Sequence, residues 1–334
     1  LPGQKKGDEE EPPKRLNYNV EYFINQVTTQ LDFSYLNQSY QVFSGSKAPI
    51  FLNPGFDILL KVGLTDLLED YRIVGGVSFG IDLTNNEYLL SFSNLKKRID
   101  KEVVFHRMVN EYNIQNLAFF RVFTHELFYI LKYPFSPVLA LKSTLSYKNE
   151  RGVYRATDLY TLSYPEVNEH TGVLKEELIY DNTKSLGQNL LLGTRFKVFG
   201  EYYQSINNTE ANMAVVGLDY RNYQRIHRTL IWANRFAYST SFGNNKLIYY
   251  MGGLDNWLFP EFNPFTPVDP EQPYAYQTLA TNLRGFDQNI RNGNSFAVIN
   301  SEIRFPVFRY FANRPIKSDF ANNFQIVGFG DIGT

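Results

Sequence analysis

Residues 71–82 read YRIVGGVSFGID, and apolar side chains recur at every second position of this stretch. One face carries Tyr71, Ile73, Gly75, Val77, Phe79 and Ile81, while the other carries Arg72, Val74, Gly76, Ser78, Gly80 and Asp82. A period of two is the period of a β-strand whose two faces meet different surroundings. The stretch therefore predicts a strand that separates an apolar environment from a more polar one.

The same alternation recurs along most of the chain. Residues 56–66, 190–201 and 214–221 each place apolar side chains on one face and charged or small side chains on the other. About a dozen such runs occur, most of them near the ~9 to 11 residues that a tilted strand needs to cross a bilayer. Strands of ordinary globular proteins have only about 5 to 6 residues. The length of the runs favours a membrane barrel.

Composition leaves two all-β architectures open. Aromatic residues make up 16% of the 334 residues, with 28 Phe and 24 Tyr, and Tyr suits a membrane interface because its ring is apolar and its hydroxyl is wet. A soluble β-sandwich with an aromatic core has a similar composition and also alternates. The length of the runs and the charges and glycines on one face favour the barrel, while a soluble, glycan-binding sandwich remains the alternative.

Several classes of function find no support in the residues. The net charge is −1, so nucleic acid is not an expected partner. The chain has no cysteine, and its four histidines lack metal-ligand spacing, so we expect neither a metal site nor a cofactor. Gly76-Val77-Ser78-Phe79-Gly80 matches the G-x-S-x-G pattern of a nucleophile elbow, but no helix is expected after it. We predict no catalytic residues and no enzymatic activity.

The chain divides into a leader and one β domain. Residues 1–28 begin with a charged, proline-containing segment that cannot bury enough apolar surface to order itself, and we assign them to a linker. Residues 29–334 are assigned to the barrel. No apolar run approaches the roughly 18 residues of a membrane helix.

Small polar clusters separate the strands and predict an antiparallel meander. They include residues 84–86, 148–152, 207–209 and 243–245. Residues 123–135 also fit helical spacing, so they are either a strand end or a short surface helix. Residues 252–295 form a connection rich in proline and aromatic residues, far longer than the ~12 to 15 residues of most loops. We expect this connection to fold against the rest of the protein.

Three segments near the end of the chain carry a resemblance to a known family. They are Leu283-Arg284-Gly285-Phe286, the strand-like run around Glu302, and Phe329-Gly330-Asp331-Ile332-Gly333. Together they resemble the BamA/TamA-type outer-membrane insertase superfamily, and Gly252-Gly253 and residues 180–183 agree with it. The resemblance is strong over residues 174–334. Residues 65–76 also look like barrels of that superfamily that follow a TolB-like propeller.

The resemblance implies a long loop folded into the barrel lumen. Its Arg284 would meet two acids of the inner wall, Glu302 and Asp331, with Phe329 and Gly333 as supporting motif residues. The strand period agrees, because Glu302 and Asp331 both fall on the polar face of their runs. The alternative is a solvated Arg284, with Glu302 paired to a neighbouring strand.

The resemblance also implies a function and a location. It predicts a barrel of the bacterial outer membrane that assists insertion, assembly or translocation of outer-membrane proteins. The expected partners are outer-membrane lipid and lipopolysaccharide, client outer-membrane proteins, and accessory lipoproteins or other subunits of an envelope complex. A passive pore or a structural subunit is the alternative. The sequence departs from the family because it has no periplasmic modules before the barrel and lacks the last strands after Thr334, so we expect an incomplete barrel.

Overall fold

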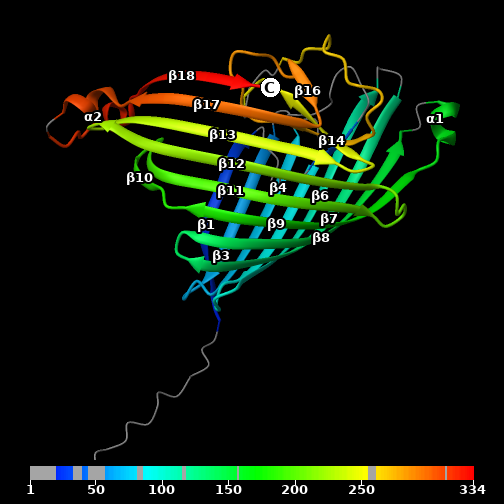
Figure 1. Cartoon of the computed structure of the whole chain (residues 1–334). Coiled ribbons are helices and arrows are strands. Elements are labelled where there is room, and N and C mark those ends of the chain that lie inside the picture. Colours follow the sequence, from blue (N-terminus) through cyan, green and yellow to red (C-terminus); the bar gives the residue numbers. More distant parts are fainter. Residues whose placement is uncertain are drawn as a thin grey trace, which may run out of the picture.

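The computed structural model describes residues 20–32, 40–43, 57–80, 86–114, 118–155, 158–254, 261–312 and 314–334. Most of them belong to one large sheet (Figure 1). Its strands are β1 (Tyr22–Asp32), β3 (Asp57–Asp66), β4 (Tyr71–Gly80), β5 (Asn86–Asn94), β6 (Asp100–Ile114), β7 (Ala118–Ser136), β8 (Leu139–Tyr154), β9 (Val167–Asp181), β10 (Lys184–Gly187), β11 (Leu190–Ser205), β12 (Asn212–His227), β13 (Leu230–Phe242), β17 (Ser295–Phe305) and β18 (Ile326–Gly333). Every pairing in it is antiparallel.

The large sheet is a meander that curves around a central space (Figure 1). Strands follow one another in chain order from β1 to β18, with β10 as a side branch on β11. Within the described residues no pairing joins β1 to β18, so the sheet is not closed. None of the described helices is long and apolar enough to span a membrane. The predicted all-β, antiparallel, barrel-type fold is confirmed.

The two faces of the sheet have opposite polarity. Apolar side chains on the convex face are exposed, as Leu145 is at 60%, Leu174 at 48% and Ile299 at 48%. Their neighbours along the strands turn inward and are buried although many are polar, such as Thr144 and Asn300. A soluble sandwich buries its apolar faces between two packed sheets. Here the apolar face points outward, so the sandwich alternative is wrong.

A second, smaller sheet fills part of the central space. It consists of β2 (Gln41–Val42), β14 (Lys246–Met251), β15 (Tyr274–Leu279) and β16 (Arg291–Gly293), in the order β16-β14-β15-β2, and β14 and β15 run parallel. Its buried side chains form a core with the inner wall, in which Leu247 and Met251 cluster with Val215 and Val298. We call residues 243–294, which connect β13 to β17, the lumen insert. The predicted folding of a long loop into the lumen is confirmed.

The insert begins earlier than the sequence indicated. The last wall strand before it, β13, ends at Phe242, whereas the sequence placed the start of the connection at residue 252. Residues 246–251 are instead a strand of the small sheet, buried on both faces. The prediction of an insert over residues 252–295 was wrong at its start, because a strand of the insert has the same apolar content as a strand of the wall.

Three other sequence assignments change. Residues 123–135 lie within β7, so the helical alternative is wrong, and residues 148–152 lie within β8 rather than in a turn. Strand β1 begins at Tyr22, so the boundary drawn at residue 28 falls inside a strand, while residues 1–19 and 84–85 lie outside the described part. The short helices α1 (Leu159–Ser163), α2 (Val307–Phe311) and α3 (Asp319–Asn323) had no sequence prediction.

Candidate functional site

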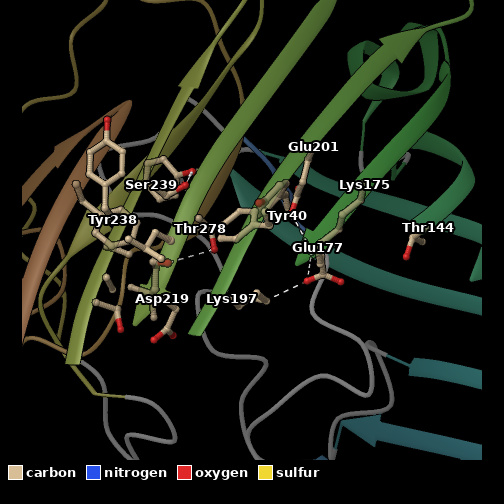
Figure 2. Close-up of a pocket in the computed structure, with 18 of the residues that line it drawn as sticks. Tyr40, Thr144, Lys175, Glu177, Lys197, Glu201, Asp219, Tyr238, Ser239 and Thr278 are labelled. Atoms are coloured by element: carbon tan, nitrogen blue, oxygen red, sulfur yellow. Dashed lines mark hydrogen bonds and ion pairs between the residues drawn. The ribbon is translucent and has the colours of Figure 1, made fainter. Parts of the chain in front are cut away.

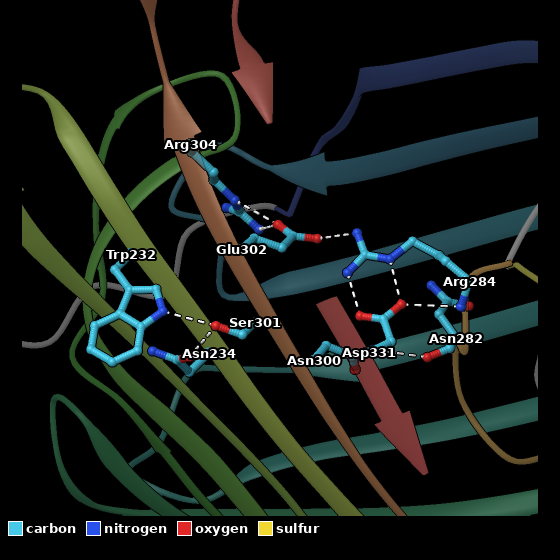
Figure 3. Close-up of polar contacts among 9 residues, drawn as sticks. All are labelled: Trp232, Asn234, Asn282, Arg284, Asn300, Ser301, Glu302, Arg304 and Asp331. Atoms are coloured by element: carbon cyan, nitrogen blue, oxygen red, sulfur yellow. Dashed lines mark hydrogen bonds and ion pairs between the residues drawn. The ribbon is translucent and has the colours of Figure 1, made fainter. Parts of the chain in front are cut away.

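The insert carries Arg284 on a tight loop that follows β15. Leu283 is buried in the core shared with the wall, and it forms a bridge with Gly253, whose carbonyl oxygen accepts a hydrogen bond from the Leu283 amide at 3.2 Å. Gly285 has a φ of 86°, a conformation that favours glycine. The buried Leu283 and the turn at Gly285 together aim the Arg284 side chain at the inner face of β17 and β18 (Figure 3).

Arg284 is held by both predicted acids. Its Nε donates to Asp331 Oδ2 at 2.6 Å, its Nη2 donates to Asp331 Oδ1 at 2.6 Å, and its Nη1 donates to Glu302 Oε1 at 2.5 Å. The Arg284 backbone N–H also donates to Asp331 Oδ2 at 3.0 Å. A planar guanidinium that binds one carboxylate through two parallel bonds forms a strong and directional pair. We call Arg284, Glu302 and Asp331 the arginine clasp.

The charges of the clasp are well shielded from solvent. The side chain of Asp331 is 2% exposed, and those of Arg284 and Glu302 are mostly buried. Asp331 and then Glu302 raise the pKa of Arg284 above its ordinary value, through hydrogen bonds that favour the charged form. Asp331 lies on β18 and Glu302 on β17, so one guanidinium bridges two adjacent strands of the wall.

A second arginine extends the clasp along β17. Arg304 donates through Nε and Nη2 to Glu302 Oε2 at 2.9 and 2.7 Å, so Glu302 has an arginine on each of its oxygens (Figure 3). Arg304 Nη1 also donates to the carbonyl oxygen of Asn189 at 2.7 Å, between β10 and β11. No role was predicted for Arg304, although its position two residues after Glu302 puts both on the same face of the strand.

The remaining motif residues lie at or near the clasp. The guanidinium carbon of Arg284 lies 4.0 Å from the centroid of the Phe329 ring, which adds a cation–π contact. Gly333 lies opposite Val298, and a Cβ there would come within 2.7 Å of the Met251 side chain. Phe286 is exposed, and its carbonyl oxygen accepts from the Gly253 amide at 2.9 Å. The structure thus brings Arg284, Glu302, Asp331 and Phe329 together, whereas the side chain of Phe286 is exposed.

The insert is also anchored on the far side of the lumen, through a contact that the sequence pattern did not predict. Tyr276 on β15 donates its hydroxyl to Glu150 Oε2 on β8 at 3.0 Å, and Glu150 Oε1 pairs with Lys148 Nζ at 2.8 Å. The Lys148 ammonium lies 4.5 Å from the centroid of the Tyr276 ring. All three side chains are buried. A clasp on β17 and β18 and an anchor on β8 therefore hold the insert from two sides.

A buried charged group in the wall was also missed. His106 on β6 lies between two glutamates, with Nε2 2.6 Å from Glu87 Oε1 and Nδ1 2.9 Å from Glu126 Oε2. Because both ring nitrogens face carboxylate oxygens, the geometry fits an imidazolium that donates on both sides. This group ties β5, β6 and β7 together. Within the described residues, no group of three or more His, Cys, Asp or Glu has the arrangement of a metal site.

The G-x-S-x-G segment has an ordinary structural explanation. Ser78 lies within β4 and is 1% exposed, with the chain continuing as a strand through Gly80. A nucleophile elbow requires a sharp strand-to-helix turn that exposes the serine. Gly76, Ser78 and Gly80 are therefore inward-facing residues of the wall.

Comparison with solved structures identifies the fold. The chain is similar to the crystal structure of BamA from Haemophilus ducreyi lacking POTRA domains 1–3, with a TM-score of 0.54, 10% sequence identity, and coverage of 93% of this chain and 63% of that chain. CdiB from Acinetobacter baumannii aligns over 94% of this chain and 55% of that chain, with 11% identity and a TM-score of 0.49. No protein-family model and no curated protein matches the sequence.

The similarity confirms the predicted resemblance at the level of the fold. At 10% identity the BamA comparison concerns the path of the chain and says nothing of individual residues. The chain also spans less than two-thirds of the BamA chain that it matches. The TolB-like propeller suggested by residues 65–76 stays a prediction.

Proposed function

We propose that this chain, which has the fold of the BamA barrel, forms the membrane barrel of a bacterial outer-membrane protein that assists insertion, assembly or translocation of other outer-membrane proteins. The observation that carries the proposal is the arginine clasp. A loop that enters the lumen and is fixed there by Arg284, Glu302 and Asp331 is the arrangement that the family resemblance implies.

The polarity of the sheet supports the membrane part of the proposal. The convex face carries exposed apolar side chains along many strands, among them Leu60, Leu90, Val103, Leu127 and Val198. In water such a surface is unfavourable, whereas lipid solvates it. This face would contact outer-membrane lipid and lipopolysaccharide, and the polar, buried face would line the lumen.

The clasp would act as a structural lock and would not perform chemistry. Arg284 joins the insert to two neighbouring strands at once, so it would keep the insert seated and hold β17 and β18 in register. In the mechanism of the BamA/TamA-type insertases, a seam between the first and last strands opens and templates client strands by β-augmentation. The outer edge of β1 has no partner within the described residues and would contribute one side of that seam.

Reconstitution into liposomes tests the proposal. The protein is placed in lipid vesicles, an unfolded client barrel is added, and folding of the client is followed by its heat-modifiable mobility on a gel. We expect faster folding than in empty vesicles, and slower folding with Arg284→Ala than with Arg291→Ala, which removes an exposed arginine of the same insert. Vesicles that carry the protein but fold the client no faster than empty vesicles would contradict the proposal.

The alternative roles give different results in the same preparation. A passive pore would conduct ions across a planar bilayer without any effect on client folding. A structural subunit of an envelope complex would do neither, and would instead co-purify with its partners. Accessory lipoproteins, if the protein uses them, would raise the client folding rate when they are added to the vesicles.

A further inference from the structure

The lumen contains a cavity of about 910 Å³ between the insert and the inner wall. Its wall side includes strands β7 to β9 and β11 to β13, and its other side includes residues 277–282 of the insert. We call it the lumen chamber. Its volume lies within the range of ~300 to 1,000 Å³ that small-molecule sites occupy. Figure 2 shows part of it, with the charged side chains of Lys175, Glu177 and Lys197 close together.

Lysines surround one buried carboxylate in this chamber. Lys142 on β8, Lys175 on β9 and Lys197 on β11 place their Nζ atoms 3.4, 3.6 and 3.2 Å from the carboxylate oxygens of Glu177. Lys175 also pairs with Glu201 at 2.8 Å. Three ammonium groups therefore share two carboxylates, which leaves one positive charge in excess.

On β12 and β13, arginines likewise outnumber the carboxylate that they bind. Arg221 and Arg235 lie directly opposite each other on β12 and β13, and both bind Asp219, at 2.8 and 2.7 Å. Like charges directly opposite on a sheet are destabilising unless an anion lies between them. Asp219 provides one negative charge for the two arginines that it binds.

The cations around Glu177 are more exposed than the carboxylates that they bind. The side chain of Lys197 is 42% exposed, whereas that of Glu177 is 6% exposed. Lys142 and Lys175 are likewise more exposed than the acids they bind. The insert side of the chamber is uncharged over residues 277–282. The other two charges of the lining, Glu126 and Lys148, are opposite in sign and are paired with His106 and Glu150. A solute that enters the chamber therefore meets a positive surface.

We propose that the lumen chamber binds a multiply charged phosphate group, held by Lys142, Lys197, Arg221 and Arg235. Lys142 and Lys197 contact opposite oxygens of Glu177, so their ammonium groups are spaced to bind one oxyanion between them. Lys197 lies directly opposite Asp219, which places the arginine pair beside it. Arginine forks and lysine ammonium groups are the side chains that bind phosphate in proteins. The proposal is independent of the insertase role, because it uses only residues of the chamber.

Calorimetric titration of the detergent-solubilised protein with pyrophosphate at fixed ionic strength tests the proposal. We expect saturable binding that weakens by about tenfold or more in the double variant Lys142→Gln/Lys197→Gln, since each of its two substitutions removes a charge-assisted contact. The control Lys101→Gln/Lys184→Gln removes two exposed lysines outside the chamber and should leave binding unchanged. Lys197→Arg keeps the charge and should retain most of the affinity. Heat-modifiable mobility of each variant checks that it is folded.

Two sources of the phosphate are distinguished by a second titration, with mixed micelles that contain phosphatidic acid. If these micelles compete with pyrophosphate, the chamber accepts a lipid headgroup; if they do not, it takes a soluble phosphate compound. Both outcomes support the site. It is refuted if pyrophosphate shows no saturable binding to the folded protein. It is also refuted if the chamber variant and the control variant lose affinity equally, because the binding would then come from general surface charge.

Discussion

Replacement of Arg284 by alanine is the most informative perturbation of this protein. The substitution removes three hydrogen bonds to carboxylate oxygens, all between 2.5 and 2.6 Å, and the contact with the Phe329 ring. Loss of one partner from a buried ion pair costs about 3 to 5 kcal/mol. Here both acids keep a donor, because the backbone N–H of residue 284 still reaches Asp331 and Arg304 still binds Glu302. We therefore expect a loss of about 2 to 3 kcal/mol.

The loss of stability in Arg284→Ala should appear first as local opening of the insert. If the insert opens locally, a change of about 2 to 3 kcal/mol raises the population of the open form by roughly 30- to 150-fold. Limited proteolysis of the folded protein in detergent measures this population, because cleavage within residues 261–294 requires opening. We expect the cleavage rate to rise by a factor of that size while the barrel keeps its heat-modifiable mobility.

Arg291→Ala is the matched control, since it removes an exposed arginine from β16 of the same insert. Exposed substitutions of this kind change stability by about 0.5 kcal/mol or less. Arg284→Lys should fall between the two, because it keeps the charge but cannot bind Asp331 through two parallel bonds. Equal cleavage rates for Arg284→Ala and Arg291→Ala would refute the reasoning.

Three further substitutions probe the rest of the account. Gly252→Ala should destabilise the insert by about 2 kcal/mol or more, because φ is 107° there and a Cβ would overlap the carbonyl oxygen of Asp287; unchanged proteolysis of the insert would count against it. Tyr276→Phe deletes the hydrogen bond to Glu150 and should cost about 1.5 to 3 kcal/mol in urea unfolding, with an unchanged midpoint as the contrary result. Leu145→Arg should cost about 2 to 4 kcal/mol in lipid vesicles if residue 145 faces the bilayer midplane, whereas Leu145→Ile should be near neutral; equal stability of the two variants would mean that this face does not meet lipid.

The alternation of side chains allowed much of the wall to be predicted. On β17 the sequence pattern put Glu302 on the polar face, and Glu302 does point inward to Arg284 while Ile299 and Ile303 are exposed. Side-chain direction in a strand depends only on the parity of the residue number, so a local pattern is sufficient. The family motif predicted Glu302 and Asp331 as the partners of Arg284. The alternation of side chains agreed, because it placed both acids on the polar face of their strands.

Polar residues inside the lumen explain why residues 148–152 were wrongly predicted to form a turn. Residues 148–152 have the composition of a turn, yet Lys148 and Glu150 are inward-facing residues of β8 with a partner on the insert. In a soluble protein a cluster of Lys, Asn, Glu and Gly marks a loop because such residues need water. In this fold the buried face is polar, so the composition of a turn and that of a wall strand overlap.

Contacts between distant segments were beyond the sequence pattern. Tyr276 and Glu150 are separated by 126 positions, and nothing local in either segment indicates the other. The same holds for β2, whose two residues pair with β15 in the lumen. The short helices α2 and α3 each contain five residues, too few for a helical period to emerge from the pattern.

A double-mutant cycle between Arg284 and Asp331 tests the central claim most directly. The free energy of unfolding is measured in urea for the wild type, Arg284→Gln, Asp331→Asn and the double variant, in the same lipid or detergent. If the guanidinium and the carboxylate are paired inside the barrel, the two losses are not additive, and the coupling energy is about 1.5 kcal/mol or more. Additive losses within about 0.5 kcal/mol would mean that the two residues do not meet, which contradicts the arginine clasp.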